Sequence, residues 1–222
     1  MTGRPKPPGP FGPGWARWVA WVIAHGWLST RVLGRQHVPK RGPVILAVNH
    51  SGLVDGPVVL GVAGRGMHFL IKQELVRGIG GRILLAAGQV PVARGSGRTA
   101  LETALELLER ERVVGIFPEG TRGAGRVADV QAGVGWLAVH SGAPVIPVAC
   151  LGTRLTGEPV NTIPKLRRPV VISFAEQVDL APVRRLGKSR EAVSLAIDLV
   201  GAALASHVAS TEVATGIVLP DA

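Results

Sequence analysis

The chain has 222 residues, of which 46% are hydrophobic and 18% charged, and this balance excludes a disordered tail protein and a coiled coil. Its 25 basic and 15 acidic residues give a formal net charge of +10, which indicates an anionic partner: nucleic acid, a phosphorylated substrate or an anionic membrane surface. A single cysteine, Cys150, excludes an intramolecular disulfide framework and a cysteine-based zinc site. The lack of tyrosine argues against a single-strand nucleic-acid binder that stacks bases on exposed aromatic rings.

The amino terminus divides into a stretch rich in proline and glycine and a stretch rich in tryptophan. Residues 1–14 hold five prolines and four glycines, so we expect a mobile tail without a helix. Residues 15–33 are expected to form an amphipathic helix whose apolar run, Trp15 to Leu28, is too short to span a bilayer. Indole rings prefer the headgroup boundary, which favours a helix lying flat in one leaflet. The alternative is a helix packed on its own domain, with tryptophan as core filler.

Residues 34–210 alternate between short apolar runs and helical patterns and are expected to form the main domain, followed by a C-terminal tail at 211–222. Strands are expected at Val44–Val48, Met67–Ile71, Val90–Val92, Val113–Phe117, Val145–Cys150 and Val170–Phe174. Helices are expected at Gly56–Ala63, at 74–87, after a Ser96 N-cap, at Val130–His140 and at Ser189–His207. Pro147 indicates an edge strand or a strand end. Strands separated by helices predict an α/β domain with a mostly parallel or mixed sheet flanked by helices.

A histidine and an aspartate follow the first buried strand of this domain. Ligands bind outside the carboxyl ends of strands in such sheets, and Asn49-His50-Ser51 stands at one of these ends. On a regular helix, residues five apart point about 140° away from each other, but a turn at Gly52 can bring His50 and Asp55 together. Asp55 would then orient the imidazole as a general base. The alternatives are that Asp55 is a simple N-cap and that His50 is an ordinary loop histidine.

A second polar segment, Phe117-Pro-Glu-Gly-Thr-Arg122, follows another expected strand. It offers a carboxylate, a flexible glycine, a hydroxyl and a guanidinium, and Arg122 is suited to bidentate phosphate binding. The alternative is an ordinary turn with a surface ion pair. A His50–Asp55 dyad without a protein nucleophile implies that the substrate supplies a hydroxyl, which would attack an activated acyl group.

Four blocks of sequence in order resemble the lysophosphatidic acid acyltransferase family, the 1-acylglycerol-3-phosphate O-acyltransferases of the glycerolipid acyltransferase superfamily. The blocks are Asn49-His50-x4-Asp55, Gly88-Gln-Val-Pro-Val-Ala-Arg94, Phe117 to Arg122, and Val145-Ile-Pro-Val148. The resemblance covers residues 30–175 and implies a glycerolipid-acyltransferase-like fold with an N-terminal membrane-interface helix. It also implies acyl transfer from an acyl-CoA or acyl carrier protein thioester to the free hydroxyl of 1-acylglycerol-3-phosphate, which gives phosphatidic acid in phospholipid biosynthesis.

The resemblance assigns roles to individual residues and implies no metal and no tightly bound cofactor. His50 would be the general base and Asp55 its orienting partner. The substrate-binding residues that it implies are Arg94, Glu119, Gly120, Thr121 and Arg122. The two arginines would hold the phosphate of the acceptor, and the last block would contribute an apolar strand associated with acyl-chain binding.

Two positions depart from the family's pattern, and they bear on the alternatives. Ala93 stands where an acidic or polar residue is usual, and Gln131 stands where a lysine is common. An acyltransferase for another lysolipid hydroxyl is therefore the second hypothesis. A non-catalytic cationic module that binds membranes or nucleic acid is the third, and it leaves the four ordered blocks unexplained. For the enzyme we expect a peripheral or monotopic protein on the cytoplasmic face of the cell membrane. Its partners would be a lysophospholipid, an acyl thioester, an anionic membrane surface and, where it carries the acyl group, acyl carrier protein, but no nucleic acid.

Overall fold

The protein is described by a computed structural model for residues 7–9, 11–93, 97–127 and 130–221. The strands are β1 (Ser29–Leu33), β2 (Val44–Val48), β3 (Met67–Lys72), β4 (Val90–Val92), β5 (Val113–Ile116), β6 (Val145–Leu151) and β7 (Pro169–Phe174). The helices are α1 (Phe11–Val22), α2 (Asp55–Val62), α3 (Gly78–Ala86), α4 (Gly97–Glu109), α5 (Ala132–Ser141), α6 (Ala181–Arg185) and α7 (Arg190–Thr215). Shorter turns are a π-helical turn at Ile23–Trp27 and 3-10 turns at Arg35–His37 and Gln73–Val76.

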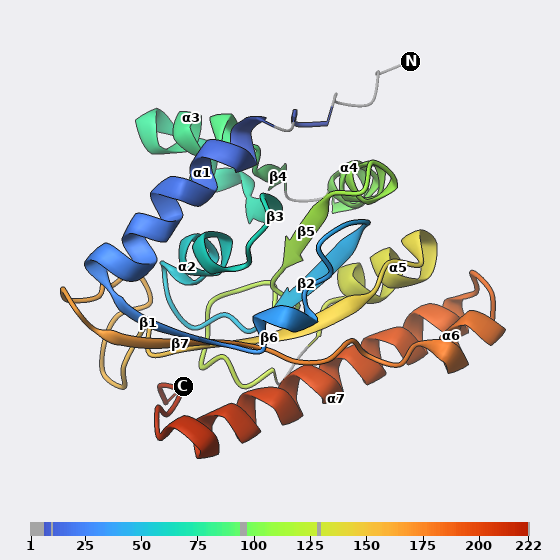
Figure 1. The fold of residues 1–222 in the computed structure, drawn as a ribbon. Helices are drawn as coiled ribbons and strands as arrows, with labels where there is room; N and C mark the ends of the chain where they lie inside the picture. The colour runs from blue at the N-terminus through green and yellow to red at the C-terminus, as the bar shows by residue number, and fades with distance from the viewer. Residues whose placement is uncertain (1–6, 10, 94–96, 128–129, 222) are drawn as a thin grey trace.

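The strands form one seven-stranded sheet in the order β1-β7-β6-β2-β5-β3-β4 (Figure 1). The β6/β7 pair is antiparallel, and the other neighbouring pairs are parallel. The predicted α/β class with a mostly parallel, mixed sheet is therefore confirmed. The six expected strands are all present, with ends shifted by at most one residue.

Both faces of the sheet are buried, because helices cover each of them. Along β2, the side chain of Leu46 belongs to the core that includes α1 and α2, whereas Ile45 and Ala47 belong to the core under α4, α5 and α7. The helix α7 is long and apolar enough to cross a membrane by length and composition. Its buried side chains recur at every fourth residue from Ala192 to Val208 and pack on the sheet, so we assign it to the core.

The amino-terminal boundaries differ from those expected. Helix α1 begins at Phe11 rather than at residue 15, and Pro13 falls in its first turn, where a missing N–H breaks no helical hydrogen bond. Helical structure ends at Trp27, and residues 29–33 form the edge strand β1 on β7 instead of continuing a helix to residue 33. The pattern Ser-Thr-Arg-Val-Leu, with two β-branched residues, is compatible with this pairing.

Alanines, not tryptophans, attach the amino-terminal helix to the domain. Ala16 and Ala20 of α1 are buried against α2. A Cβ at Gly61 of α2 would lie 2.5 Å from the Ala20 carbonyl oxygen, so this glycine permits the close approach of the two helices. The Trp18 side chain is 62% exposed, and those of Trp15 and Trp21 are also exposed. The tryptophans are therefore not core fillers.

Three further expectations need correction. The helix expected at 74–87 is divided into the turn at Gln73–Val76 and α3, and Gly78, at the start of α3, has a left-handed φ of +64. Pro147 lies inside β6, an interior strand. The pairing of β6 with β7 starts only at Val148, so no residue of β7 stands opposite the N–H that Pro147 lacks.

The tail expected from residue 211 is helical to Thr215, and Leu219 beyond this helix is buried.

Candidate active site

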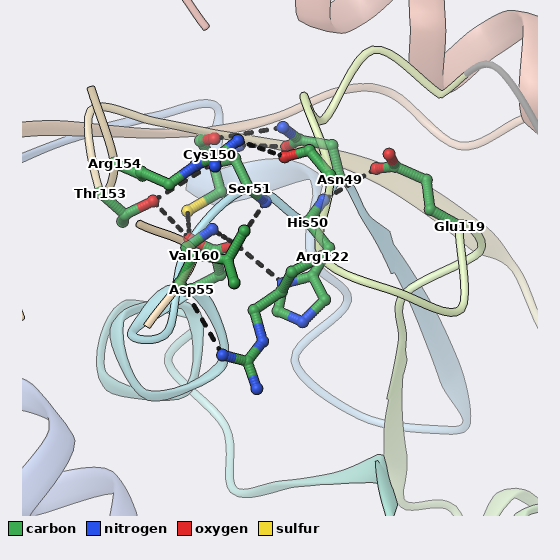
Figure 2. Close-up of polar contacts among 12 residues, drawn as sticks. Asn49, His50, Ser51, Asp55, Glu119, Arg122, Cys150, Thr153, Arg154 and Val160 are labelled. Atoms are coloured by element: carbon green, nitrogen blue, oxygen red, sulfur yellow. Dashed lines mark hydrogen bonds and ion pairs between the residues drawn. The ribbon is translucent and has the colours of Figure 1, made fainter. Parts of the chain in front are cut away.

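Two polar segments meet because the strands that precede them are parallel neighbours. β2 pairs with β5, so Asn49-His50-Ser51 and Pro118-Glu119-Gly120 leave the same edge of the sheet. The contacts between these segments are drawn in Figure 2. Helix α2 begins at Asp55, directly after the turn that follows His50. The edge that sequence reasoning selected is therefore where the polar side chains gather.

His50 and Asp55 form a hydrogen-bonded dyad across the turn at Gly52. His50 Nδ1 lies 2.8 Å from Asp55 Oδ2, and the backbone N–H groups of Ser51 and Gly52 donate to the same oxygen, each at 2.8 Å. Asp55 is fully buried. Because these amides precede α2, Asp55 is not the simple N-cap of that helix. A Cβ at Gly52 would lie 2.8 Å from Thr153 Oγ1, so a side chain at this turn would clash.

The second carboxylate oxygen of Asp55 is held from β6 and the loop after it. Thr153 Oγ1 donates to Asp55 Oδ1, and the Cys150 thiol donates to the same oxygen at 3.5 Å. Burial, followed by the charge of Asp55, raises the pKa of Cys150 well above its ordinary value, which makes this thiol a core residue rather than a nucleophile. Sequence reasoning missed Thr153. Its place just beyond the carboxyl end of β6, next to β2, was the available signal.

The imidazole of His50 is fixed in its plane by aromatic stacking. Its ring lies on Phe117 with centroids 3.9 Å apart and planes at 15°, and Phe117 stacks in turn on Phe69. Since a carboxylate only accepts, Nδ1 donates its hydrogen to Asp55 and Nε2 carries the free lone pair. Nε2 has no hydrogen-bond partner among the described residues, and the side chain of His50 is 15% exposed. The dyad therefore presents a base to solvent.

Glu119 and Asn49 hold the backbone around His50. Glu119 Oε1 accepts from the His50 N–H at 2.8 Å, and burial raises the pKa of Glu119 although this bond opposes the shift. The Asn49 amide accepts from Cys150 N at 2.7 Å and donates to Cys150 O at 3.2 Å, which ties β2 to β6. Glu119, expected to bind substrate, thus contacts the backbone of the histidine.

Arg122 is attached to the loop between β6 and β7. Its Nη1 donates to the carbonyl oxygen of Val160 at 3.4 Å and to Asn161 Oδ1. The next residue, Gly123, donates its N–H to His50 O at 3.1 Å, which ties the backbone beside Arg122 to the dyad. The carbonyl of Gly123 accepts from Arg154, a buried arginine that sequence reasoning also missed.

The other expected substrate-binding residues are placed less tightly. Gly120 has a φ of +66, a left-handed conformation that favours glycine, and both Gly120 and Thr121 are exposed. A Cβ at Gly120 would lie 3.0 Å from the side chain of Gln131. Arg94 lies outside the described residues, as does Ser96. Within the described ranges, no group of three or more His, Cys, Asp or Glu side chains is arranged to hold a metal ion.

Residues 29–151 match the model of the family described as Acyltransferase, a span that contains the dyad and Arg122. The chain belongs to this family. It is 30% identical over 127 residues to the 1-acyl-sn-glycerol-3-phosphate acyltransferase of Bacillus subtilis, covering 56% of this chain and 63% of the relative. It is also 30% identical over 127 residues to the enzyme of that name from Borreliella burgdorferi, covering 55% of this chain and 51% of the relative. These alignments span less than two thirds of the relatives' length.

The fold is similar to a solved structure that covers most of the chain. The crystal structure of the 1-acyl-sn-glycerophosphate (LPA) acyltransferase PlsC from Thermotoga maritima superposes with a TM-score of 0.67 at 24% sequence identity. The match covers 91% of this chain and 78% of the other. At this identity the likeness supports the fold, including the amino-terminal helix and the flanked mixed sheet.

Proposed function

We propose that this acyltransferase moves an acyl group from a thioester, acyl-CoA or acyl carrier protein, to the free hydroxyl of 1-acylglycerol-3-phosphate, which gives phosphatidic acid. The observation that carries the proposal is the His50–Asp55 dyad with its open Nε2, in a family member whose relatives bear that enzyme's name. The product would be an intermediate of phospholipid biosynthesis. The reaction uses no metal or bound cofactor in this proposal.

In the proposed mechanism His50 Nε2 removes the proton of the acceptor hydroxyl. The resulting oxygen nucleophile attacks the thioester carbonyl and forms a C–O bond, and the tetrahedral intermediate collapses with cleavage of the C–S bond. The imidazolium then returns its proton to the departing thiolate, so the enzyme ends the cycle unchanged. Asp55, whose carboxylate is fixed by two backbone amides, Thr153 and the histidine, opposes the positive charge that develops on His50.

Arg122 is proposed to hold the phosphate of the acceptor, together with Arg94 from the second sequence block. A guanidinium offers paired donors that fit phosphate oxygens. The hydrogen bond from the Gly123 N–H to the His50 carbonyl oxygen holds the backbone next to Arg122 at the dyad. Gly120 and Thr121 would line the acceptor's path, and Glu119 would act by fixing His50 rather than by touching substrate. Gln131, whose side chain lies close to Gly120, stands where the family resemblance implies a lysine.

Membrane association is the second part of the proposal, with an anionic lipid surface as the partner and the cytoplasmic face as the location. The support is the row of exposed tryptophans on α1, a helix too short to span. Because alanines of α1 lie in the core, deleting the helix would damage the fold. Replacing Trp15, Trp18 and Trp21 together by serine is the sharper test, and it should release protein from anionic vesicles while Val213→Ser, on α7, does not.

The reaction is tested by thiol release from purified protein with a panel of acyl-CoA thioesters and lysolipids. The proposal expects release that depends on 1-acylglycerol-3-phosphate. Equal or better rates with a lysolipid lacking the terminal phosphate group would favour the second candidate, an acyltransferase for another hydroxyl, to which the departures at Ala93 and Gln131 point. No release with any acceptor would leave a non-catalytic module, which a salt titration on DNA against anionic vesicles would then characterise.

A further inference from the structure

The connection between the antiparallel neighbours β6 and β7 is much longer than a hairpin requires. It runs over residues 152–168 without a helix or strand, and long connections of this kind usually carry a function. Within it, Ile163 is 67% exposed and Leu166 is 60% exposed, and Leu155 is exposed as well. Residues 155–167 are called the β6–β7 segment below.

The exposed apolar residues of the β6–β7 segment alternate with cations. Lys165 stands between Ile163 and Leu166, and Arg167 follows, with both basic residues exposed. Glu158, the acidic residue of the segment, is neutralised by a bidentate ion pair with Arg168 at 2.5 and 2.6 Å. Apolar side chains with adjacent exposed cations are typical of surfaces that enter the headgroup region of an anionic bilayer.

The β6–β7 segment is bonded to the end of the tryptophan-rich helical region. The indole Nε1 of Trp27 donates to the carbonyl oxygen of Pro164 at 2.9 Å, and the Arg167 N–H donates to the carbonyl oxygen of Trp27 at 2.7 Å. Figure 1 shows the loops between β6 and β7 beside the end of α1 that leads into β1. The segment therefore lies beside the exposed Trp27, at the end of the tryptophan-rich helical region.

The other end of the β6–β7 segment reaches the candidate active site. Val160 and Asn161 accept the hydrogen bonds of Arg122, and Thr153, just before the segment, donates to Asp55. A bilayer that contacts the segment would therefore lie next to the guanidinium proposed to hold the acceptor's phosphate (Figure 2).

We infer that the β6–β7 segment, with Trp27, is a second membrane-contact surface whose occupant is an anionic lipid bilayer. Helix α1 and this segment both contact the same bilayer, and the contact places Arg122 at the level of the lipid phosphates. The inference rests on the proposed function for the membrane as partner. It adds the residues that make the second contact: Ile163 and Leu166 for the apolar part, and Lys165 and Arg167 for the charged part.

A fluorophore attached to the β6–β7 segment reports directly on contact between this segment and a bilayer. Leu166→Cys is labelled with an environment-sensitive probe, and the native Cys150 is buried with a raised pKa, so it does not compete for the label. Val213→Cys is the matched control, since Val213 is 88% exposed on the outer side of α7, which covers the other face of the sheet from α1. With vesicles of phosphatidylcholine and phosphatidylglycerol, the probe at 166 should shift to the blue and the probe at 213 should not.

An affinity measurement with unlabelled protein gives a second readout. Ile163→Ser combined with Leu166→Ser should weaken binding to these vesicles by about tenfold, whereas Val213→Ser should leave it unchanged. Absence of the blue shift at 166, or unchanged vesicle affinity of the double variant, overturns the inference. The tryptophan-to-serine variant then decides whether α1 alone binds the vesicles.

If the parent protein does not bind the vesicles, the membrane part of the proposed function is refuted. Thiol release with a soluble acceptor still tests the proposed chemistry. Capture of a protein partner by the segment without vesicle binding would also contradict the inference.

Discussion

Replacing Asp55 by asparagine separates the charge of the carboxylate from its hydrogen-bonding geometry. The amide oxygen of asparagine can accept from His50 Nδ1 and from the Ser51 and Gly52 amides, which all bond to one carboxylate oxygen at 2.8 Å. The amide nitrogen then faces Thr153, whose hydroxyl can rotate to accept. We therefore expect the Asp55→Asn protein to fold, with a melting temperature close to that of the parent, and to lack only the negative charge beside the imidazole.

The size of the loss follows from the charge that develops on His50 during proton transfer. Two unit charges about 4 Å apart attract by roughly 4 kcal/mol at an effective dielectric constant of about 20. Each 1.36 kcal/mol is a factor of ten in rate, so kcat for thiol release should fall by about 10²–10⁴, with little change in the KM of the acceptor. The control Thr153→Val removes one donor but keeps the charge, and it should cost at most about tenfold. A folded Asp55→Asn protein with kcat within tenfold of the parent would refute the role assigned to Asp55.

Three further outcomes are expected. Arg122→Ala should raise the acceptor KM by about 10–100-fold and spare the KM of the thioester, and an unchanged acceptor KM there and in Arg94→Ala would place the phosphate elsewhere. Glu119→Ala should lower kcat by loosening the His50 backbone, whereas Glu119→Gln keeps an acceptor and should retain most activity; equal losses would contradict this. Arg168 holds the pKa of Glu158 at about 2 instead of 4.5, so the pair's contribution is complete above pH 4.5 and lost as the pH falls through 2. Arg168→Met should therefore cost about 1–2 kcal/mol of unfolding free energy at pH 7 and less at pH 2, as denaturant titrations at the two pH values would reveal.

The parts of the fold that local sequence determines were predictable. Val44–Val48 is apolar throughout because both of its faces are covered, and such a run between turn residues indicates a buried strand. The polar residues after β2 and β5 marked the edge where His50 and Glu119 meet. A turn at Gly52 made a contact between His50 and Asp55 possible, and the structure brings the two side chains together.

The parts that depend on distant pairing were not predictable from local pattern. The local pattern predicts a helix over residues 29–33, which form β1 instead, because the partner β7 lies far along the chain and an edge strand of five residues carries a weak signal. Thr153 and Asn161 lie in a connection without periodicity, so nothing local indicates that they bond to Asp55 and Arg122. Pro147 suggested an edge, and only the end of β7 one residue away explains why an interior strand accepts it.

The most direct test of the account is the rate of thiol release by His50→Ala with an acyl-CoA and 1-acylglycerol-3-phosphate. His50 contacts Asp55 and Phe117 at the surface of the site, so the variant should keep the parent's circular dichroism and melting temperature. The account predicts a fall in kcat of about 10²–10⁴ or more, because the hydroxyl then has no positioned base. A folded His50→Ala protein that turns over at a rate near that of the parent would contradict it.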